Sequence, residues 1–404
     1  MDDTSNEIEI IDGGSKVDFY EADTGESAVG FSAQAQRDKF LGGSANETTN
    51  TMLEEKKPIL PPIDEVKSHV LRWSDPNVRR QYADAVQSLY RAEEVDTPEG
   101  KRINMVRTSI MDLTHSVQGT QQKIHNIGTA HDKNPNSEMN VILRERVQNY
   151  IEQTPREQRY FMLEGWNAPE GQDLPKEYRD LLDSVKQQEG ETEEDAYQRV
   201  VQRFGEQGIG LFYAMKLGIP VDFHTEISQE KEVEAFKAAG LSETDIAAFL
   251  LPKYLDIYKQ GNEFNPDDQF TQQQILEAIS KIAKVTGWKK DELETLSPDQ
   301  QRKFIAQAVA EVNQVTQKEI GRVIISSDYR PQYKFANEIA SYRDRSRVAS
   351  TMFSVGIDTR DLHVTERAYK AVQEGKSPFL IFGDSHTYKI DPALTYLSSQ
   401  AKAA

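Results

Sequence analysis

The sequence predicts an α/β protein, with α+β as the alternative: a small, mostly parallel sheet flanked by helices, with N-terminal helices and a helical insertion. Two observations lead to this prediction. Strand-like runs alternate with helical periodicity between residues 121 and 225, and a further strand-like run, "PFLIFG", returns at 378–383. Such alternation is typical of parallel strands joined by helical crossovers.

The first predicted unit consists of a strand, a loop, a helix and a second strand. The run "QKIHNIGTAH" (122–131) precedes a turn-rich stretch, and Ser137 is the expected N-cap of the following helix. A second short run, "RYFMLEGW", occupies 159–166. The helix between them is predicted from apolar residues at helical spacing: Met139, Ile142, Leu143, Val147 and Tyr150.

The rest of the core is expected to follow the same order. One helix over about 193–217 leads into a third predicted strand, "IPVDFH" (219–224), and "PFLIFG" supplies the fourth. We therefore divide the chain as follows: 1–60, a disordered acidic tail; 63–120, an N-terminal helical region; 121–225, the first half of the α/β core; 226–335, a helical insertion or lid; and 336–404, the second half of the core.

The first 60 residues differ in composition from the rest. They carry 13 Asp and Glu against 5 Lys and Arg, with few periodic apolar residues. Such a segment cannot bury enough apolar surface to offset its ordering entropy, which predicts disorder. A tail of this kind could recruit a protein partner.

Composition excludes several classes of function. The net charge of −18 argues against nucleic acid as a partner, and no apolar run is long enough to span a membrane. Cysteine is absent, so disulfides, thiol nucleophiles and Cys-based zinc sites are excluded. The N-terminus lacks the basic-then-apolar order of a classical secretory signal. Both a cytoplasmic location and export without such a signal stay open.

Polar side chains stand where the predicted strands end. His131 follows the first strand, Glu164 ends the second, His224 ends the third and His386 follows the fourth. Open α/β sheets place their sites at the carboxyl ends of the strands, so these groups are expected to converge. They could hold a divalent cation or act as general acid and base without metal. Each could instead only pack or cap a loop.

One arginine is a further candidate. In "SYRDRSRVASTM", Arg345 shares a helical face with Tyr342, Ala349 and Met352. An arginine within a buried stripe needs an anionic partner, and a developing oxyanion would serve. The alternative is a surface basic cluster with no part in a site.

The order of these elements resembles a superfamily that contains TraB-like proteins, Tiki proteases, ChaN-like haem-binding proteins and erythromycin esterases. The resemblance covers about 122–224 and 336–395 and rests on "IGTAH", "YFMLEG", "GIGLFYAMKLGIPV", an arginine-bearing helix and "LIFGDSH". It implies two Gly-x-x-His motifs, a strand-end glutamate and an arginine, here Gly128 with His131, Gly383 with His386, Glu164, and Arg345 or Arg343. Thr129 replaces the glutamate of erythromycin-esterase-like members, which favours the TraB and Tiki side.

The expected function is therefore that of a hydrolase of amide or ester bonds, acting on a peptide or a small-molecule ester. The resemblance implies that His131, Glu164 and His386 act in catalysis or bind a divalent cation, for which Mn²⁺, Co²⁺ and Zn²⁺ are the candidates. His224 is a candidate added ligand because the third strand departs from the family pattern there, and Arg345 is expected at the oxyanion. One rival is a haem- or metal-binding protein without turnover. Another is an exported effector or interaction protein in which the motif histidines are dispensable.

Overall fold

A computed structural model describes residues 58–97, 100–166, 168, 174–255, 269–321, 323, 325 and 346–402. The chain divides into two compact units. One combines Met1–Glu226 with Asp361–Ala404, and the other is Ile227–Arg360. The predicted tail, 1–60, lies outside the described residues except for its last three positions, 58–60. Within the described part of the chain, no helix is long and apolar enough to cross a bilayer.

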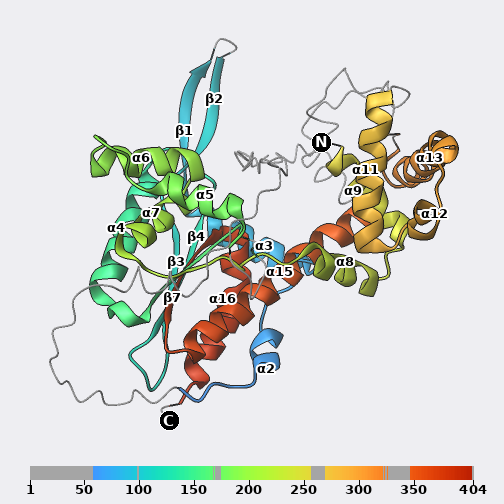
Figure 1. The fold of residues 1–404 in the computed structure, drawn as a ribbon. Coiled ribbons are helices and arrows are strands. Elements are labelled where there is room, and N and C mark those ends of the chain that lie inside the picture. Colours follow the sequence, from blue (N-terminus) through green and yellow to red (C-terminus); the bar gives the residue numbers. More distant parts are fainter. Residues whose placement is uncertain are drawn as a thin grey trace, which may run out of the picture. The chain divides into compact units, whose positions relative to one another are not determined.

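The first unit is built on a five-stranded sheet, which confirms the predicted α/β class (Figure 1). The outer strand β3 is antiparallel to β4, whereas β4, β7, β5 and β6 are mutually parallel. In spatial order the strands are β3 (Met111–Ser116), β4 (Lys123–Thr129), β7 (Ser377–Gly383), β5 (Arg159–Leu163) and β6 (Val221–Asp222). The C-terminal strand β7 thus lies at the centre, between two strands from the first half of the chain.

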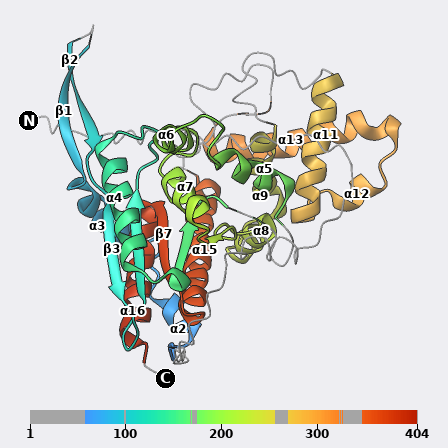
Figure 2. The same ribbon diagram turned by 60° about the vertical axis from the view of Figure 1, so that its left-hand side comes forward.

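Side chains of the central strand alternate between two helical layers. Phe379 and Ile381 pack into one apolar cluster, and Leu380 and Phe382 pack into another on the opposite face. The first layer contains α4 (Glu138–Gln153), α5 (Lys176–Val185), α6 (Glu193–Phe204) and α7 (Gln207–Leu217); the second contains α2 (Ile63–Ser68), α16 (Asp384–Gln400) and the C-terminal part of α15 (Arg347–Gln373) (Figure 2).

Local sequence explains where the first-layer helices begin and end. Ser137 caps α4 by accepting a hydrogen bond from the Asn140 backbone N–H, as predicted. The single helix expected over 193–217 is in fact two helices. Gly205 adopts φ 65° between them, a conformation that favours glycine and ends α6. The next residue, Glu206, is the N-cap of α7 and contacts His131.

The prediction of helices throughout 63–120 is wrong for much of that region. Only α2 and α3 (Pro76–Gln87) are helical; β1 (Tyr90–Thr97) and β2 (Gly100–Arg107) form an antiparallel hairpin, with Tyr90 opposite Arg107. Tyr90 does not extend the helix before it, because it pairs with Arg107, a partner that lies beyond the next turn. The strand β3 was missed because its polar sequence, "MDLTHS", belongs to a sheet edge.

The second unit is helical in every described element. Its helices are α8 (Gln229–Ala238), α9 (Glu243–Tyr254), α11 (Gln269–Thr286), α12 (Lys290–Glu294), α13 (Gln301–Ile320) and the N-terminal part of α15. They enclose an apolar cluster of their own, with Ile246, Ile279 and Val312 fully buried. Its predicted role as a lid stays a prediction.

Candidate functional site

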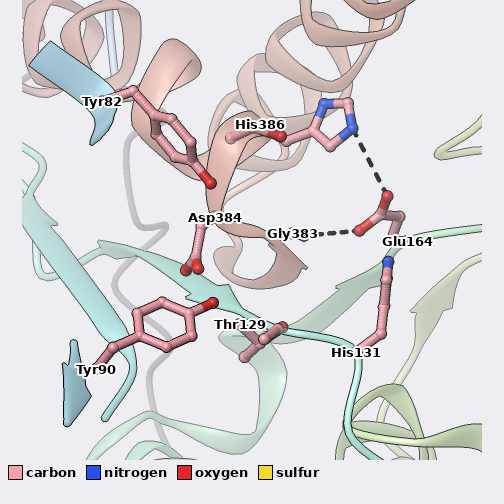
Figure 3. Close-up of a pocket in the computed structure, with 10 residues that line it drawn as sticks. Tyr82, Tyr90, Thr129, His131, Glu164, Gly383, Asp384 and His386 are labelled. Atoms are coloured by element: carbon pink, nitrogen blue, oxygen red, sulfur yellow. Dashed lines mark hydrogen bonds and ion pairs between the residues drawn. The ribbon is translucent and has the colours of Figure 1, made fainter. Parts of the chain in front are cut away.

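A small cavity of about 120 Å³ lies at the carboxyl ends of β4, β5 and β7 (Figure 3). The position follows from the topology, because three parallel strands deliver their succeeding loops to one edge of the sheet. The cavity is lined by Tyr82, Tyr90, Thr129, Ala130, His131, Glu164, Gly383, Asp384, Ser385 and His386. Both Gly-x-x-His histidines and the strand-end glutamate therefore share one cavity.

His386 lies in the first turn of α16 and is held by a buried carboxylate. Its Nδ1 is 2.5 Å from Oδ1 of Asp361, and the two side chains are 7% and 0% exposed. The Nζ atom of Lys389 is 2.5 Å from the other oxygen of Asp361 and is fully buried. That oxygen lacks a well-aligned hydrogen bond, so we regard the Lys389 contact as an ion pair. Lys389 also lies over the Trp73 ring, 5.6 Å from its centroid.

Glu164 faces His386 from the end of β5. One carboxylate oxygen lies 3.6 Å from His386 Nε2, and the other accepts a 2.7 Å hydrogen bond from the backbone N–H of Gly383. The backbone N–H of Glu164 in turn contacts the carbonyl of Ile381, 3.2 Å away. The loops after two neighbouring strands thus fix the carboxylate in place.

His131 approaches the same cavity from the end of β4. Its Nδ1 lies 2.9 Å from a carboxylate oxygen of Glu206, whose side chain is 2% exposed, whereas the imidazole is 48% exposed. The second oxygen of Glu206 accepts from the backbone N–H of Asp132 at 3.2 Å. Glu206 is the N-cap of α7, where the helix dipole favours a negative charge.

Asp384, at the start of α16, pairs with an arginine from the hairpin. The guanidinium of Arg107 contacts both carboxylate oxygens, at 2.5 and 2.8 Å, and both side chains are buried. Gly128 lies beneath this pair. A Cβ there would stand 2.8 Å from the Asp384 carboxylate and 2.9 Å from Met111 Cβ. The glycine of the first motif therefore lets α16 approach β4 closely.

The predicted site residues divide into three groups. His131, Glu164, Gly383 and His386 line the cavity. His224 does not; its Nδ1 lies 2.6 Å from the Ala168 carbonyl. Arg343 and Arg345 lie outside the described residues.

Sequence reasoning missed several side chains of this site: Asp361, Lys389, Glu206, Arg107, Tyr82 and Tyr90. One local signal was present, because Lys389 stands three residues after His386 and so shares its helical face. Asp361 is 25 positions before His386, and Arg107 is 277 before Asp384. Pairing over such distances has no local signature.

The predicted metal site stays a prediction. Within the described part of the chain, no three His, Asp or Glu side chains are arranged to hold a metal ion. The Nδ1 atom of each motif histidine contacts a protein carboxylate, which leaves Nε2 as the nitrogen that could bind a metal ion.

In comparisons with known proteins, no family model, curated protein or solved structure matches the chain.

Proposed function

We propose that the protein hydrolyses an ester or amide bond, with His386 as the general base. The observation that carries this proposal is the contact between His386 Nδ1 and Asp361. A carboxylate that accepts from Nδ1 leaves the other ring nitrogen of a neutral imidazole as the proton acceptor. In His386 that nitrogen, Nε2, faces Glu164 across the cavity.

A water molecule beside His386 and Glu164 can contact both groups. Their separation of 3.6 Å is longer than a direct hydrogen bond, and it is short enough for one water in the cavity to bond to both. The Gly383 N–H bond fixes the orientation of the Glu164 carboxylate. In this proposal His386 removes a proton from the water, and Glu164 orients it.

His131 would act at the mouth of the cavity. It is the more exposed of the two motif histidines, and Glu206 holds its ring from behind. We assign it to binding the leaving-group side of the substrate through the ring nitrogen that does not face Glu206, whereas the proton for the leaving group comes from His386. This role agrees with a substrate that enters from the rim.

The proposed reaction balances with water as the only co-reactant. The water oxygen bonds to the acyl carbon, its proton passes to His386 Nε2, and the carbonyl electron pair moves onto oxygen. Collapse of the tetrahedral intermediate breaks the bond to the alcohol or amine, which takes the proton back from the imidazolium of His386. The products are a carboxylic acid and an alcohol or amine.

Cavity size favours turnover over haem binding. The cavity of about 120 Å³ is smaller than the roughly 300–1,000 Å³ of sites that enclose drug-sized ligands. It accommodates a reacting acyl group, with the remainder of a substrate outside. A porphyrin would require the walls to separate.

The proposal is tested by hydrolysis of 4-nitrophenyl acetate and of an acetyl anilide. His386→Gln should lower kcat about 10²- to 10⁴-fold, the usual contribution of a general base. His69→Gln is the matched control, because His69 is exposed and absent from the cavity. Equal rates for wild type and His386→Gln with both probes would refute the proposal.

A further inference from the structure

The wall of the cavity opposite Glu164 and His386 comes from the N-terminal segment. Tyr82 of α3 and Tyr90 of β1 both line the cavity. Their hydroxyl groups point inward, on the far side from Glu164, His131 and His386 (Figure 3). Asp384 is drawn on the same side as the two phenols, and its carboxylate is paired with Arg107. The opposite side carries Glu164, His131 and His386.

Packing fixes the position of the Tyr82 ring. It meets Trp73 edge-on, with centroids 5.4 Å apart, and Tyr388 at 5.8 Å. Tyr388 belongs to α16, the helix that carries His386. The phenol of Tyr82 is thus held in a constant relation to the proposed general base.

Arg107, which forms an ion pair with Asp384, fixes the position of the Tyr90 ring. The guanidinium of Arg107 lies 5.1 Å from the centroid of the Tyr90 ring and also holds Asp384 at the start of α16. Tyr90 and Arg107 are direct partners across the hairpin. The base of the hairpin therefore contacts α16, the helix on which Tyr82 also packs.

We infer that Tyr82 and Tyr90 are catalytic residues that donate hydrogen bonds to the oxyanion formed in the proposed reaction, on which this inference rests. Negative charge that develops on a carbonyl oxygen needs preorganised donors, and tyrosine hydroxyls can supply them. The carboxylates of Glu164 and Asp384 cannot stabilise an anion, and the Arg107 donors are engaged by Asp384. The phenols stand opposite the base, where an acyl group between the two walls would direct its oxygen.

This assignment gives the hairpin a function in the reaction. The step itself is unchanged: as water adds to the acyl carbon, the oxygen gains the electron pair and accepts hydrogen bonds from two neutral phenols. No proton leaves either tyrosine. The N-terminal elements complete the site that the two Gly-x-x-His motifs begin.

The test replaces each hydroxyl by hydrogen. Tyr82→Phe and Tyr90→Phe should each lower kcat for 4-nitrophenyl acetate about 10²-fold, with KM little changed, because the lost donor acts on the transition state. Tyr388→Phe is the matched control: its ring packs on Tyr82, and it does not line the cavity. Unaltered melting temperatures would show that the rings still pack.

A second readout needs no turnover. Ethylboronic acid becomes tetrahedral when it takes up hydroxide, and ¹¹B NMR reports its affinity. The wild type should bind it, His386→Gln should lose binding, and Tyr82→Phe with Tyr90→Phe should weaken it. Unchanged kcat and boronate affinity in the double phenylalanine variant would overturn the tyrosine assignment and leave the hydrolase intact. A wild type that neither turns over ester nor binds boronate would overturn both.

Discussion

The Asp361 carboxylate lies 2.5 Å from Nδ1 of His386, and both side chains are withdrawn from solvent. Carboxylate–imidazole pairs of this kind fix the ring orientation and its tautomer. Asp361 comes from α15, whereas His386 belongs to the C-terminal motif. The proposed base thus depends on a residue outside both Gly-x-x-His motifs.

Removing the Asp361 carboxylate, which accepts a hydrogen bond from His386 Nδ1, should impair turnover. Asp361→Asn presents an amide that can donate to Nδ1, which places the imidazole proton on Nε2 and blocks water activation. We expect kcat for 4-nitrophenyl acetate to fall about 10³- to 10⁴-fold. Asp391→Asn, which alters a more exposed contact to His115, is the control. Wild-type kcat in Asp361→Asn would show that Asp361 does not position His386.

Loss of the buried Lys389 cation should destabilise the protein. Lys389→Met leaves the Asp361 charge without its 2.5 Å ion-pair partner in a fully buried position. Breaking such a pair costs about 3–5 kcal/mol of unfolding free energy. The double variant Asp361→Asn, Lys389→Met should be less destabilised than the sum of the two single changes, because no lone charge is left. Urea unfolding measures all four proteins, and strict additivity would exclude the coupling.

The two motif glycines should differ in their tolerance of a methyl group. Gly128→Ala places Cβ within 2.8 Å of Asp384 and 2.9 Å of Met111, so the contact between β4 and α16 must open. We expect a loss of about 1–3 kcal/mol in unfolding free energy. At Gly383 the nearest atom would be 3.5 Å away, an ordinary contact, so Gly383→Ala should change stability little. Equal losses at both positions would contradict the packing account.

Stability should fall in mild acid because of His125. Burial among aromatic rings lowers the pKa of this histidine from 6.5 to about 4. Between pH 6.5 and 4, His125 is therefore protonated in the unfolded chain and neutral in the folded chain. Stability present above pH 6.5 is lost as the pH falls through this window, by about 3 to 4 kcal/mol at most.

The pH dependence of urea unfolding checks this sign. His125→Phe keeps an aromatic ring beside Phe379 and Tyr150 and removes the titrating group. Its unfolding free energy should change less between pH 6.5 and 4 than that of the wild type. An identical slope in both proteins would assign the acid sensitivity to other groups.

The sequence predicts the centre of the fold better than its edges. Buried parallel strands such as β7 are short apolar runs between turn signals, and a serine cap marks α4; both features are local. The hairpin and β3 are polar, and their pairing partners lie beyond a turn, so single-segment periodicity misassigns them. Gly205 ends α6 because its φ angle is positive, and the spacing of apolar residues does not predict that angle.

The same distinction holds for the site. His131, Glu164 and His386 could be predicted to converge because parallel strands deliver them to one edge. Asp361, Glu206 and Arg107 act through contacts that tertiary packing creates between distant segments. His224 was misplaced for a related reason: its ring turns to the Ala168 carbonyl instead of the shared cavity.

The tautomer of His386 tests the central claim most directly. ¹⁵N NMR of histidine-labelled protein distinguishes the two ring nitrogens, and the His386→Gln variant identifies the signal. The account predicts a neutral imidazole with its proton on Nδ1, towards Asp361, and an unprotonated Nε2 in the cavity. A neutral ring protonated on Nε2 would contradict it, since His386 could not then take a proton from water.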